Sequence, residues 1–418
     1  MKFTAPSTIK GTVAAPPSKS MMGRAVAAAL LADGASRIAN GSFCDDGLTA
    51  LAIIGALGAR IHKDEKGILT IHGTGKHALN PGGATLDCGE SGLCMRMFTP
   101  IAALQDKEVM LLASGSLRVR PMGMVEELEA LGISCKTDRG HAPITVKGPM
   151  KGGHVKVDAS VSSQLLTGLL MALPLCEKNS LISVSELKSA PYVLMTVELL
   201  KYFGVSVHHD ERLEKFLVSG NQTYVPSTYT VEGDWSGASF LLVAGATMGS
   251  VTVTGLNPGS AQADRAILDV LERVGASIER AGDSVSVGRK ELKPFQYDAT
   301  GCPDLFPPLV ALASSCEGKS IIYGLERLAH KESDRARALV SEFAKLGIVI
   351  NITGNRMEVH GGSVREAVVD AHNDHRIAMA CAVAGLRAKG NISINGEACV
   401  SKSYPGFFAD LEAIRATE

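Results

Sequence analysis

Charged residues gather directly before apolar segments of this chain. The stretch LAHKESDRARALV places Lys331, Glu332 and Arg335 just ahead of a run of apolar residues. Such a pattern is typical of a helix start, with Ser333 or Asp334 as the N-cap. A carboxylate flanked by two cations could also move protons beside an anionic ligand. Both interpretations stay open on this stretch alone.

Polar and cationic residues precede other apolar segments in the same way. Taken singly, Ser162, Ser163 and Asp304 are explained as helix caps, Arg24 by pairing with an acid, and Tyr192 by packing. The candidate positions outside the first stretch are Lys19, Ser20, Arg24, Gly92, Arg96, Arg120, Ser162, Ser163, Gln164, Ser189, Tyr192, Asp304, Arg376 and Lys402.

Capping alone does not require a cation at nearly every one of these starts. Helix N-termini present unpaired N–H groups and the positive end of the helix dipole, so they bind phosphate or carboxylate. Arginine adds a bidentate fork for the same groups, and lysine adds a point charge. A strongly positive site for more than one anionic group is predicted by Lys19, Arg24, Arg96, Arg120, Lys331, Arg335, Arg376 and Lys402.

A repeat in the sequence indicates how these turns are arranged along the chain. Five segments each contain an amphipathic helix, a glycine that ends it and an alternating strand. Their glycines, separated by 74, 72, 71 and 72 residues, are Gly58, Gly132, Gly204, Gly275 and Gly347. This period is longer than that of a solenoid, so each unit is predicted to be a small α/β subdomain.

A second, more apolar helix is expected in every unit, as in SSQLLTGLLMALPL and PDLFPPLVALASS. A sixth unit is expected to be split across the termini, with 18–34 as its second helix and 405–416 as its first. Six units with joined ends predict two three-unit domains with two chain crossings. The candidate turns would then face each other across a cleft.

Composition excludes several other classes of protein. The 418 residues are 45% hydrophobic and 20% charged with a net charge of −1, as in a soluble protein that has no general affinity for nucleic acid or anionic membranes. Apolar runs are too short to span a bilayer, and the N-terminus has no apolar signal region. Nine scattered cysteines without C-x-x-C pairs favour reduced thiols in the cytoplasm. His372 and His375 lack a third ligand nearby, which disfavours a metal site.

Nine motifs together resemble the 5-enolpyruvylshikimate-3-phosphate synthase family. They occur in the family's order and cover nearly the whole chain: PPSKSMMGR, GESGLCMR, RVRPM, SVSSQ, PYVLMT, CPDLFP, HKESDR, NDHRIAMA and SKSYPGF. The resemblance implies an α/β (α+β) enolpyruvyl-transferase fold, an inside-out α/β barrel of six βαβαββ units, three per domain. It implies one domain at 13–229 and another at 1–12 plus 230–418, with the active site in the cleft between them.

The resemblance also implies the reaction and the site residues. The carboxyvinyl group of phosphoenolpyruvate moves to the 5-hydroxyl of shikimate 3-phosphate, and phosphate is released, without a metal or redox cofactor. The implied shikimate 3-phosphate contacts are Lys19, Ser20, Arg24, Ser162, Ser163, Gln164, Ser189, Tyr192, Asp304 and Lys331. The implied phosphoenolpyruvate contacts are Lys19, Gly92, Arg96, Arg120, Gln164, Arg335, Arg376 and Lys402.

Three residues resemble the family's catalytic groups. Asp304 resembles the group at the 5-hydroxyl, Glu332 the group at the methylene carbon, and Lys19 a group that assists phosphate departure. Cations beside Glu332 favour its charged form, so it needs partial desolvation to hold a proton. We expect a cytoplasmic monomer whose partners are the two small-molecule substrates.

Some positions depart from the common family pattern. Glu90 and Arg327 stand where Asn is common, Met97 replaces a Pro and Gly23 replaces an Asn. The sister family that uses a UDP-sugar acceptor usually has Lys-Asn in place of Lys19-Ser20 and a Cys in the loop SGSLRVRPM. A catalytically inactive relative should lack one of the three catalytic groups, and all three are present.

Overall fold

The computed structural model describes residues 1–76, 79, 85–329 and 331–416. Contacts within the chain divide it into two compact units. Unit 1 comprises Met1–Pro16 and Glu232–Glu418, and unit 2 comprises Pro17–Val231. The chain therefore changes unit after Pro16 and again after Val231, a few residues from the cuts expected near 12 and 230.

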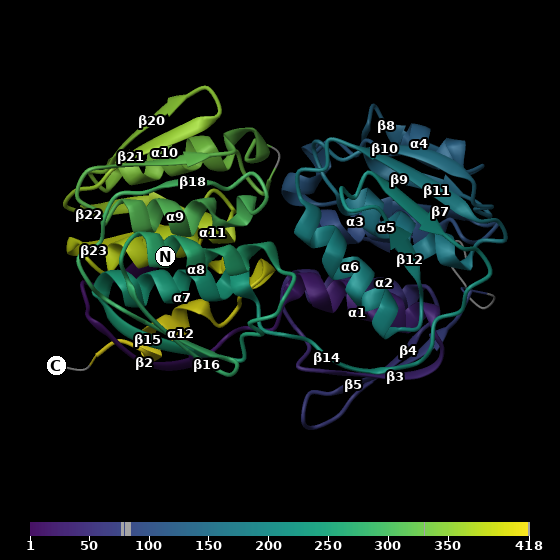
Figure 1. Cartoon of the computed structure of the whole chain (residues 1–418), viewed down its shortest axis with the longest axis horizontal. Helices are drawn as coiled ribbons and strands as arrows, with labels where there is room; N and C mark the ends of the chain where they lie inside the picture. Colours follow the sequence, from purple (N-terminus) through teal and green to yellow (C-terminus); the bar gives the residue numbers. More distant parts are fainter. Residues whose placement is uncertain (77–78, 80–84, 330, 417–418) are drawn as a thin grey trace. The chain divides into compact units, whose positions relative to one another are not determined.

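Unit 2 contains helices and short strands in regular alternation (Figure 1), where η denotes a 3₁₀ helix. Its elements are α1 (Lys19–Leu31), β3 (Asp33–Ala39), α2 (Asp45–Ala56), β4 (Arg60–Lys63), β5 (Leu69–Thr74), β6 (Thr85–Asp87), α3 (Gly92–Ala102), β7 (Glu108–Leu112), η1 (Gly115–Val119), α4 (Val125–Ala130), β8 (Ser134–Asp138), β9 (His141–Lys147), β10 (His154–Asp158), α5 (Gln164–Ala172), η2 (Leu173–Leu175), β11 (Ser180–Ser185), α6 (Ala190–Tyr202), β12 (Val207–His209), β13 (Lys215–Val218) and β14 (Thr228–Thr230).

Unit 1 repeats the same alternation. Its elements are β1 (Lys2–Thr4), β2 (Ile9–Ala14), α7 (Trp235–Met248), β15 (Gly249–Thr254), η3 (Ala263–Ala266), α8 (Ile267–Arg273), β16 (Ser277–Ala281), β17 (Ser284–Gly288), β18 (Gln296–Asp298), η4 (Pro303–Leu305), α9 (Phe306–Ala313), β19 (Lys319–Tyr323), η5 (Leu325–Arg327), α10 (Arg335–Lys345), β20 (Val349–Thr353), β21 (Arg356–His360), β22 (Arg365–Asp370), α11 (His375–Gly385), β23 (Lys389–Asn395), η6 (Glu397–Lys402) and α12 (Phe407–Ala413).

Five of the six small sheets that the structure describes share one strand order. Within the described residues, five have four strands, ordered β14-β3-β5-β4, β6-β7-β9-β8, β10-β11-β13-β12, β16-β17-β15-β2 and β18-β19-β21-β20, and a sixth has the order β1-β23-β22. In the second of these sheets, β6 runs parallel to β7 with Thr85 opposite Met110, and β9 is antiparallel to both β7 and β8. This is the βαβαββ unit that the family resemblance implied.

The repeat glycines end the amphipathic helices as predicted. All five adopt left-handed φ values between +79° and +107°, which a residue with a side chain rarely adopts. A strand follows each of them within a few residues, for example β20 after Gly347. The predicted helix–glycine–strand segments are confirmed.

Each time the chain passes from one unit to the other, the strand before the crossing pairs in the sheet of the first unit and the helix after it lies in the other unit. β2 pairs in parallel with β15 of unit 1, but the next helix, α1, belongs to unit 2. In the same way β14 pairs with β3 of unit 2 and is followed by α7 of unit 1. The prediction that 18–34 and 405–416 form one subdomain is therefore wrong, because α1 lies in unit 2 and α12 in unit 1. A repeat read in sequence order does not show where the chain crosses.

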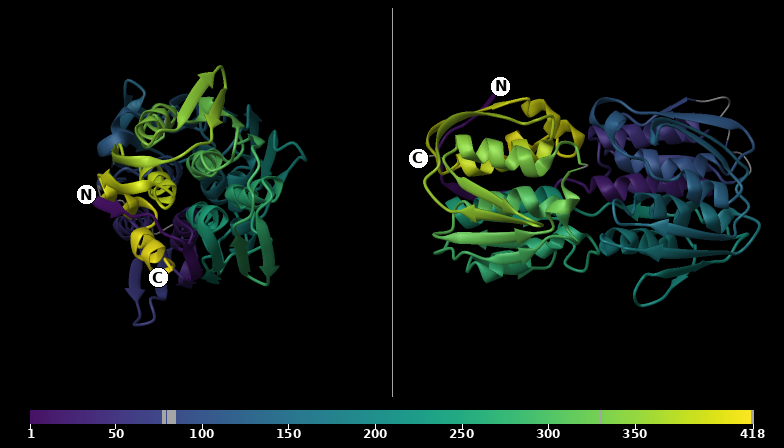
Figure 2. Two further views of the ribbon diagram at one scale, coloured as in Figure 1. Left: turned by 90° about the vertical axis from the view of Figure 1, so that its left-hand side faces the viewer. Right: turned by 90° about the horizontal axis from the view of Figure 1, so that it is seen from above.

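The more apolar helices form the centre of each unit, and the strands lie outside them (Figure 2). In unit 1, α7, α9 and α11 pack on one another, and α9 is buried along its whole length. A helix that is apolar on all sides must be buried in this way. The inside-out α/β arrangement predicted for the chain is confirmed within each unit.

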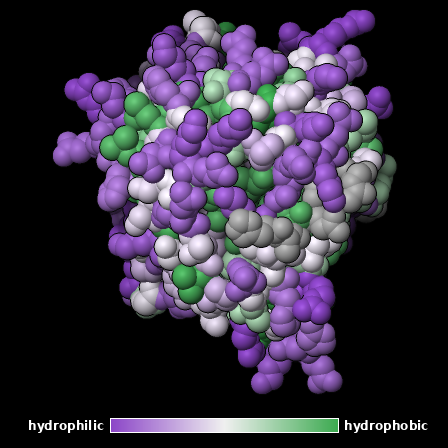
Figure 3. Space-filling view, turned by 90° about the vertical axis from the view of Figure 1, so that its right-hand side faces the viewer, coloured by the Kyte–Doolittle hydropathy of each residue, from purple (hydrophilic) through white to green (hydrophobic). Residues whose placement is uncertain are grey.

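The polarity of the surface can be seen on one face of unit 2 (Figure 3). On the face of unit 2 drawn in Figure 3, hydrophilic residues predominate and hydrophobic ones are scattered among them. Within the described residues, every helix is too short or too polar to cross a lipid bilayer.

Candidate active site

Parallel strands bring the predicted helix starts together within each unit. β6 and β7 are parallel, so the loop from β6 to α3 and the loop from β7 to η1 leave the same edge of their sheet. β10 and β11 place the starts of α5 and α6 in the same way, and β18 and β19 place η4 and the KESDR turn. Because the carboxyl ends of parallel strands meet at one edge, turns distant in sequence become neighbours.

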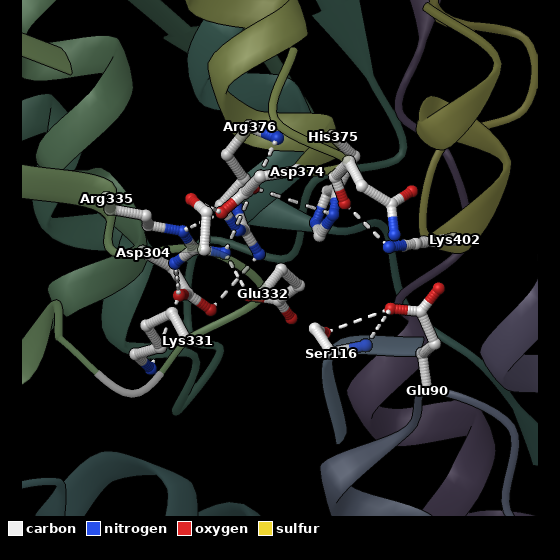
Figure 4. Close-up of polar contacts among 12 residues, drawn as sticks. Glu90, Ser116, Asp304, Lys331, Glu332, Arg335, Asp374, His375, Arg376 and Lys402 are labelled. Carbon is white, nitrogen blue, oxygen red and sulfur yellow. Dashed lines mark hydrogen bonds and ion pairs between the residues drawn. The ribbon is translucent and has the colours of Figure 1, made fainter. Parts of the chain in front are cut away.

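In unit 1 the KESDR turn forms an ion cluster around Arg335, whose side chain is 1% exposed. Its Nε donates to Asp374 Oδ2 at 2.8 Å, its Nη1 to Asp304 Oδ1 at 2.7 Å, and its Nη2 to Glu332 Oε2. Figure 4 shows these three carboxylates pointing toward the guanidinium group from different turns. One buried arginine therefore fixes Asp304 and Glu332, the two predicted catalytic carboxylates of this unit.

Three cations surround the Asp304 carboxylate. Besides Arg335, Arg376 Nη2 donates to Asp304 Oδ2 at 3.1 Å, and Lys331 Nζ lies 3.6 Å from Oδ1. Burial opposes ionisation of Asp304, but Arg376, Lys331 and Arg335 together hold its pKa well below the usual range. The interpretation of Asp304 as a helix cap is wrong, since Cys302 occupies the N-cap position of η4.

The other predicted cations of unit 1 are Lys331 and Arg376, which face this carboxylate, and Lys402 in η6, whose side chain reaches the turn before α11. Burial lowers the pKa of Lys331, an effect that Asp304 opposes and Arg335 reinforces. The Nε and Nη1 atoms of Arg376 are buried and have no partner among the described residues. Lys402 Nζ donates to the Asn373 carbonyl oxygen at 2.6 Å. These side chains bring strong hydrogen-bond donors to one end of unit 1.

In unit 2, Arg96 and Arg120 lie together at the start of α3. Arg96 Nη1 donates to Gln164 Oε1 at 3.0 Å, and Nη2 donates to the Pro121 carbonyl at 2.6 Å. Burial and the nearby charge of Arg120 lower the pKa of Arg96 to about 10. A Cβ atom on Gly92 would lie 3.0 Å from Arg96 Nη1 and 3.5 Å from Arg120 Nη1. The lack of a side chain at Gly92 therefore leaves room for both guanidinium groups.

Arg24 makes its hydrogen bonds inside unit 2, where it joins α1, α5 and α6. Its Nε donates to Thr196 Oγ1 at 2.9 Å and its Nη1 to the Ser20 carbonyl at 2.8 Å. Its Nη2 donates to the Tyr192 carbonyl at 3.1 Å and to Thr167 Oγ1 at 3.4 Å. The residue is 2% exposed, and burial lowers its pKa to about 10. Arg24, which was predicted to contact the substrate, therefore links three helices of unit 2 in this structure.

The remaining predicted residues of unit 2 lie at helix starts. Ser162 Oγ accepts a hydrogen bond from Gln164 N at 3.2 Å. Ser163 and Ser189 occupy the N-cap positions of α5 and α6, where neither side chain makes a capping hydrogen bond. Capping therefore explains only part of these serine-rich turns.

The two candidate caps of the KESDR turn have different partners. Asp334 is the N-cap of α10 and accepts from Arg337 N at 3.2 Å, so its capping role is confirmed. Ser333 Oγ donates to Asp374 Oδ2 at 3.0 Å, so its interpretation as the cap is wrong. His330, which begins the HKESDR motif, lies outside the described residues.

Sequence reasoning gave no role to two carboxylates that contact site residues. Asp374 accepts from Arg335 and also caps α11 through Arg376 N at 3.0 Å. Asp46, in the first turn of α2, pairs with Lys19 Nζ at 3.0 Å. Acidic residues at helix starts are so common that no sequence signal distinguished these two.

Histidine and cysteine side chains have ordinary surroundings. No group of three His, Cys, Asp or Glu side chains able to hold a metal ion occurs in the described part of the chain. His372 Nε2 lies 2.8 Å from Glu342 Oε1, and all nine cysteines are unpaired and buried.

Comparison with known proteins assigns the chain to one family. The family model described as EPSP synthase (3-phosphoshikimate 1-carboxyvinyltransferase) matches residues 3–411. The chain belongs to this family. The resemblance predicted from the nine motifs is confirmed.

Similar proteins match this EPSP synthase family member over almost its whole length. A 3-phosphoshikimate 1-carboxyvinyltransferase of Methanocorpusculum labreanum is 38% identical over 413 residues, covering 98% of this chain and 97% of the relative. One of Halobacterium salinarum is 39% identical over 425 residues, covering 98% of each. The solved structure of EPSP synthase from Acinetobacter baumannii has a TM-score of 0.84 at 25% identity and covers 99% of this chain and 98% of its own.

Two departures from the common EPSP synthase pattern have defined surroundings. Glu90 Oε2 accepts from the amide and the hydroxyl of Ser116 at 3.0 Å and 2.9 Å. Arg327 is 8% exposed, and its charge contributes to the lowered pKa of Lys331. Arg327 therefore brings a charge near Lys331, and Glu90 brings one to Ser116, whose hydroxyl accepts from the predicted site residue Arg120.

Proposed function

We propose that these turns carry out the reaction of the EPSP synthase family in this chain. The carboxyvinyl group of phosphoenolpyruvate is transferred to the 5-hydroxyl of shikimate 3-phosphate, and phosphate leaves, in the pathway to chorismate and aromatic amino acids. The observation that carries the proposal is the contact of Asp304 and Glu332 with Arg335, beside Lys331 and Arg376. This cluster combines donors for anionic groups with two carboxylates that can move protons.

The anionic groups of the substrates are proposed to bind at the helix starts of both units. The shikimate 3-phosphate contacts are Lys19, Ser20, Arg24, Ser162, Ser163, Gln164, Ser189, Tyr192, Asp304 and Lys331. The phosphoenolpyruvate contacts are Lys19, Gly92, Arg96, Arg120, Gln164, Arg335, Arg376 and Lys402. The proposal requires the two units, taken as the two domains of the family fold, to contact the same pair of substrates.

Proton transfer at phosphoenolpyruvate is assigned to Glu332. Its side chain is 17% exposed, which supplies the partial desolvation that a proton donor among cations needs. The carboxylate of phosphoenolpyruvate takes the place of Glu332 on Arg335, because the guanidinium N–H groups can donate to either carboxylate. Glu332, once released from Arg335, takes up a proton from solvent, gives it to the methylene carbon, and takes one back from the resulting methyl group during elimination.

Asp304 is assigned to the 5-hydroxyl of shikimate 3-phosphate. Its low pKa keeps it ionised and so able to accept a hydrogen bond, but makes it a weak base while three cations face it. When Lys331 and Arg376 turn to substrate anions, part of that stabilisation is lost and the basicity of Asp304 rises. Lys19 assists phosphate departure by neutralising the charge that develops on the leaving group.

Phosphate release tests the proposed function. The purified protein is given phosphoenolpyruvate with either shikimate 3-phosphate or a UDP-sugar acceptor, and free phosphate is measured over time. Release with shikimate 3-phosphate alone is the expected result. No release with that acceptor would contradict the proposal, and release with only the UDP-sugar would favour the sister reaction.

Glu332→Gln tests the proton-transfer role. The amide keeps the shape of the side chain but cannot hold the transferred proton, so kcat should fall by at least about 100-fold while shikimate 3-phosphate still binds. Glu326→Gln, an exposed change in the neighbouring η5, is the matched control and should leave kcat unchanged. Near-normal turnover of Glu332→Gln would remove Glu332 from the mechanism.

We further propose a cytoplasmic monomer that needs no cofactor. Nine unpaired cysteines suit a reducing compartment, and the addition–elimination chemistry requires proton transfer and charge neutralisation only. Size-exclusion chromatography with light scattering tests the oligomeric state.

A further inference from the structure

The turn that carries Arg120 is attached to Glu90 through Ser116. Glu90 Oε2 accepts from Ser116 N at 3.0 Å and from Ser116 Oγ at 2.9 Å (Figure 4). The same Ser116 oxygen accepts from Arg120 Nη2 at 2.8 Å. A hydroxyl can donate one hydrogen bond and accept another at once, so Ser116 connects the carboxylate to the guanidinium group.

The carboxyl group of Glu90 is packed directly against this turn. Gly115 has a φ of +48°, and a Cβ atom built on it would lie 2.3 Å from Glu90 Cδ. The amide of Ser114 also donates to the Gly89 carbonyl at 2.8 Å. The loop before α3 and the start of η1 are thus joined by three hydrogen bonds and a close contact that only glycine permits.

Arg120 depends on this attachment for its orientation. The residue is 7% exposed, and its Nε atom is buried with no partner among the described residues. The Ser116 hydroxyl therefore supplies the hydrogen bond that orients the guanidinium group. An arginine that binds a small anion must be held to within a fraction of an ångström, and one fixed before binding loses less entropy on binding.

We propose that Glu90 is a positioning residue for Arg120 and acts through Ser116. The inference rests on the proposed function, in which Arg120 binds phosphoenolpyruvate. A carboxylate suits this task because it forms a charge-assisted hydrogen bond with the hydroxyl and so makes the Ser116 oxygen a better acceptor for Arg120. Glu90 itself does not contact the substrate.

The contacts from Glu90 through Ser116 to Arg120 are called the relay. For the KM for phosphoenolpyruvate, loss of the relay predicts a change opposite in sign to the change expected from removing a negative charge. A negative charge near an anion site weakens anion binding, so its removal in Glu90→Ala would by itself lower the KM for phosphoenolpyruvate. Loss of the relay should instead raise the KM for phosphoenolpyruvate by at least about tenfold. The KM for shikimate 3-phosphate should stay within about twofold of the wild-type value. Glu90→Gln should stay within about threefold, because an amide oxygen can accept both hydrogen bonds from Ser116.

Ser116→Ala provides a second, milder variant that removes only the hydroxyl. It should raise the KM for phosphoenolpyruvate to a similar extent, and the double variant with Glu90→Ala should be no worse than the more impaired single variant. Glu126→Ala, which removes an exposed carboxylate from the first turn of α4, is the matched control and should change neither KM. Thermal unfolding of each variant within a few degrees of wild type shows that the fold is intact.

Three kinetic outcomes would overturn the relay: an unchanged or lowered KM for phosphoenolpyruvate in Glu90→Ala, an equal rise in both KM values, or single effects that multiply in the double variant. Crystal structures of wild type and Glu90→Ala give a readout independent of turnover. A displaced Arg120 side chain supports the relay, and an unmoved one overturns it. If wild type releases no phosphate from the two substrates, the proposed function fails, and the crystal structures alone decide the relay.

Discussion

Asp264 in η3 carries a buried carboxyl group that the proposed mechanism does not use. It is 1% exposed, its Oδ2 accepts from Ser236 Oγ, and its Oδ1 has no partner among the described residues. Burial and the negative charge of Asp304 raise its pKa to about 7, and Arg376 and the Ser236 hydrogen bond counteract this only in part. At neutral pH the group is therefore close to its titration midpoint in the folded protein.

The replacement Asp264→Asn should stabilise unit 1 in a pH-dependent manner. The folded-state pKa is raised, so the stability that this carboxyl contributes is present below pH 4 and is lost as the pH rises through about 7. The difference between about 7 and the reference value of 3.8 is about 3 pH units, which at 1.36 kcal/mol per unit gives about 4 kcal/mol. Asparagine resembles the protonated acid and does not pay this cost above pH 7.

Urea unfolding at pH 5 and pH 8 measures the effect. The free energy of unfolding of Asp264→Asn should exceed that of wild type by about 1.6 kcal/mol at pH 5, which is about 1.2 pH units above 3.8, and by about 4 kcal/mol at pH 8. Asp269→Asn, an exposed aspartate in the following helix α8, is the control and should show no such pH dependence. An equal effect at both pH values, or no gain at pH 8, would refute the assignment of a raised pKa to Asp264.

Three further predictions concern the cations of the site. A methyl group at Gly92→Ala would lie 3.0 Å from Arg96 Nη1, so the KM for phosphoenolpyruvate should rise several-fold in steady-state assays with little change for the other substrate. Arg335→Met leaves three carboxylates without their common partner and should lower the free energy of unfolding by about 3–5 kcal/mol, whereas Arg337→Met, at a side chain 88% exposed, should change it by under about 0.5 kcal/mol. Inorganic phosphate should slow amide hydrogen exchange at the start of α3 at lower phosphate concentrations than at the start of α10. The reason is that Arg96 forms no ion pair with any described residue, whereas Arg335 is already paired with carboxylates.

The sequence was sufficient to predict those features that depend on local chemistry. Glycine at each helix end, apolar residues on all sides of the central helices and an acid at the N-cap of α10 all follow from interactions within a few residues. Gly347 after α10 and Asp334 before it are examples, and both are confirmed. The polar turns were found because cations at helix starts exceed what capping requires.

Contacts between turns could not be predicted, because they depend on which strands are paired. Asp374 is an ordinary helix cap until the sheet topology brings Arg335 to it, and Ser333 donates to the same carboxylate instead of capping its own helix. The positions at which the chain crosses between the units could not be predicted for a related reason. β2 and α1 are close in sequence, but β2 finds its parallel partner β15 in unit 1 whereas α1 packs in unit 2.

The two units balance their charges differently, and the proposed mechanism assigns them different parts in the reaction for this reason. In unit 1 each cation of the cluster faces a carboxylate, so bringing in a substrate anion requires an exchange of partners on Arg335. Such an exchange is useful where a proton must move, because it changes the charge around Glu332 and Asp304 at the moment of binding. In unit 2, Arg96 and Arg120 are buried side by side without an ion pair among the described residues, and the charge of Arg120, after burial, lowers the pKa of Arg96. An anion bound between the two guanidinium groups would reduce this repulsion. Glu90 lies one hydroxyl away from Arg120, so in the proposed relay it orients the guanidinium without taking the place of the substrate.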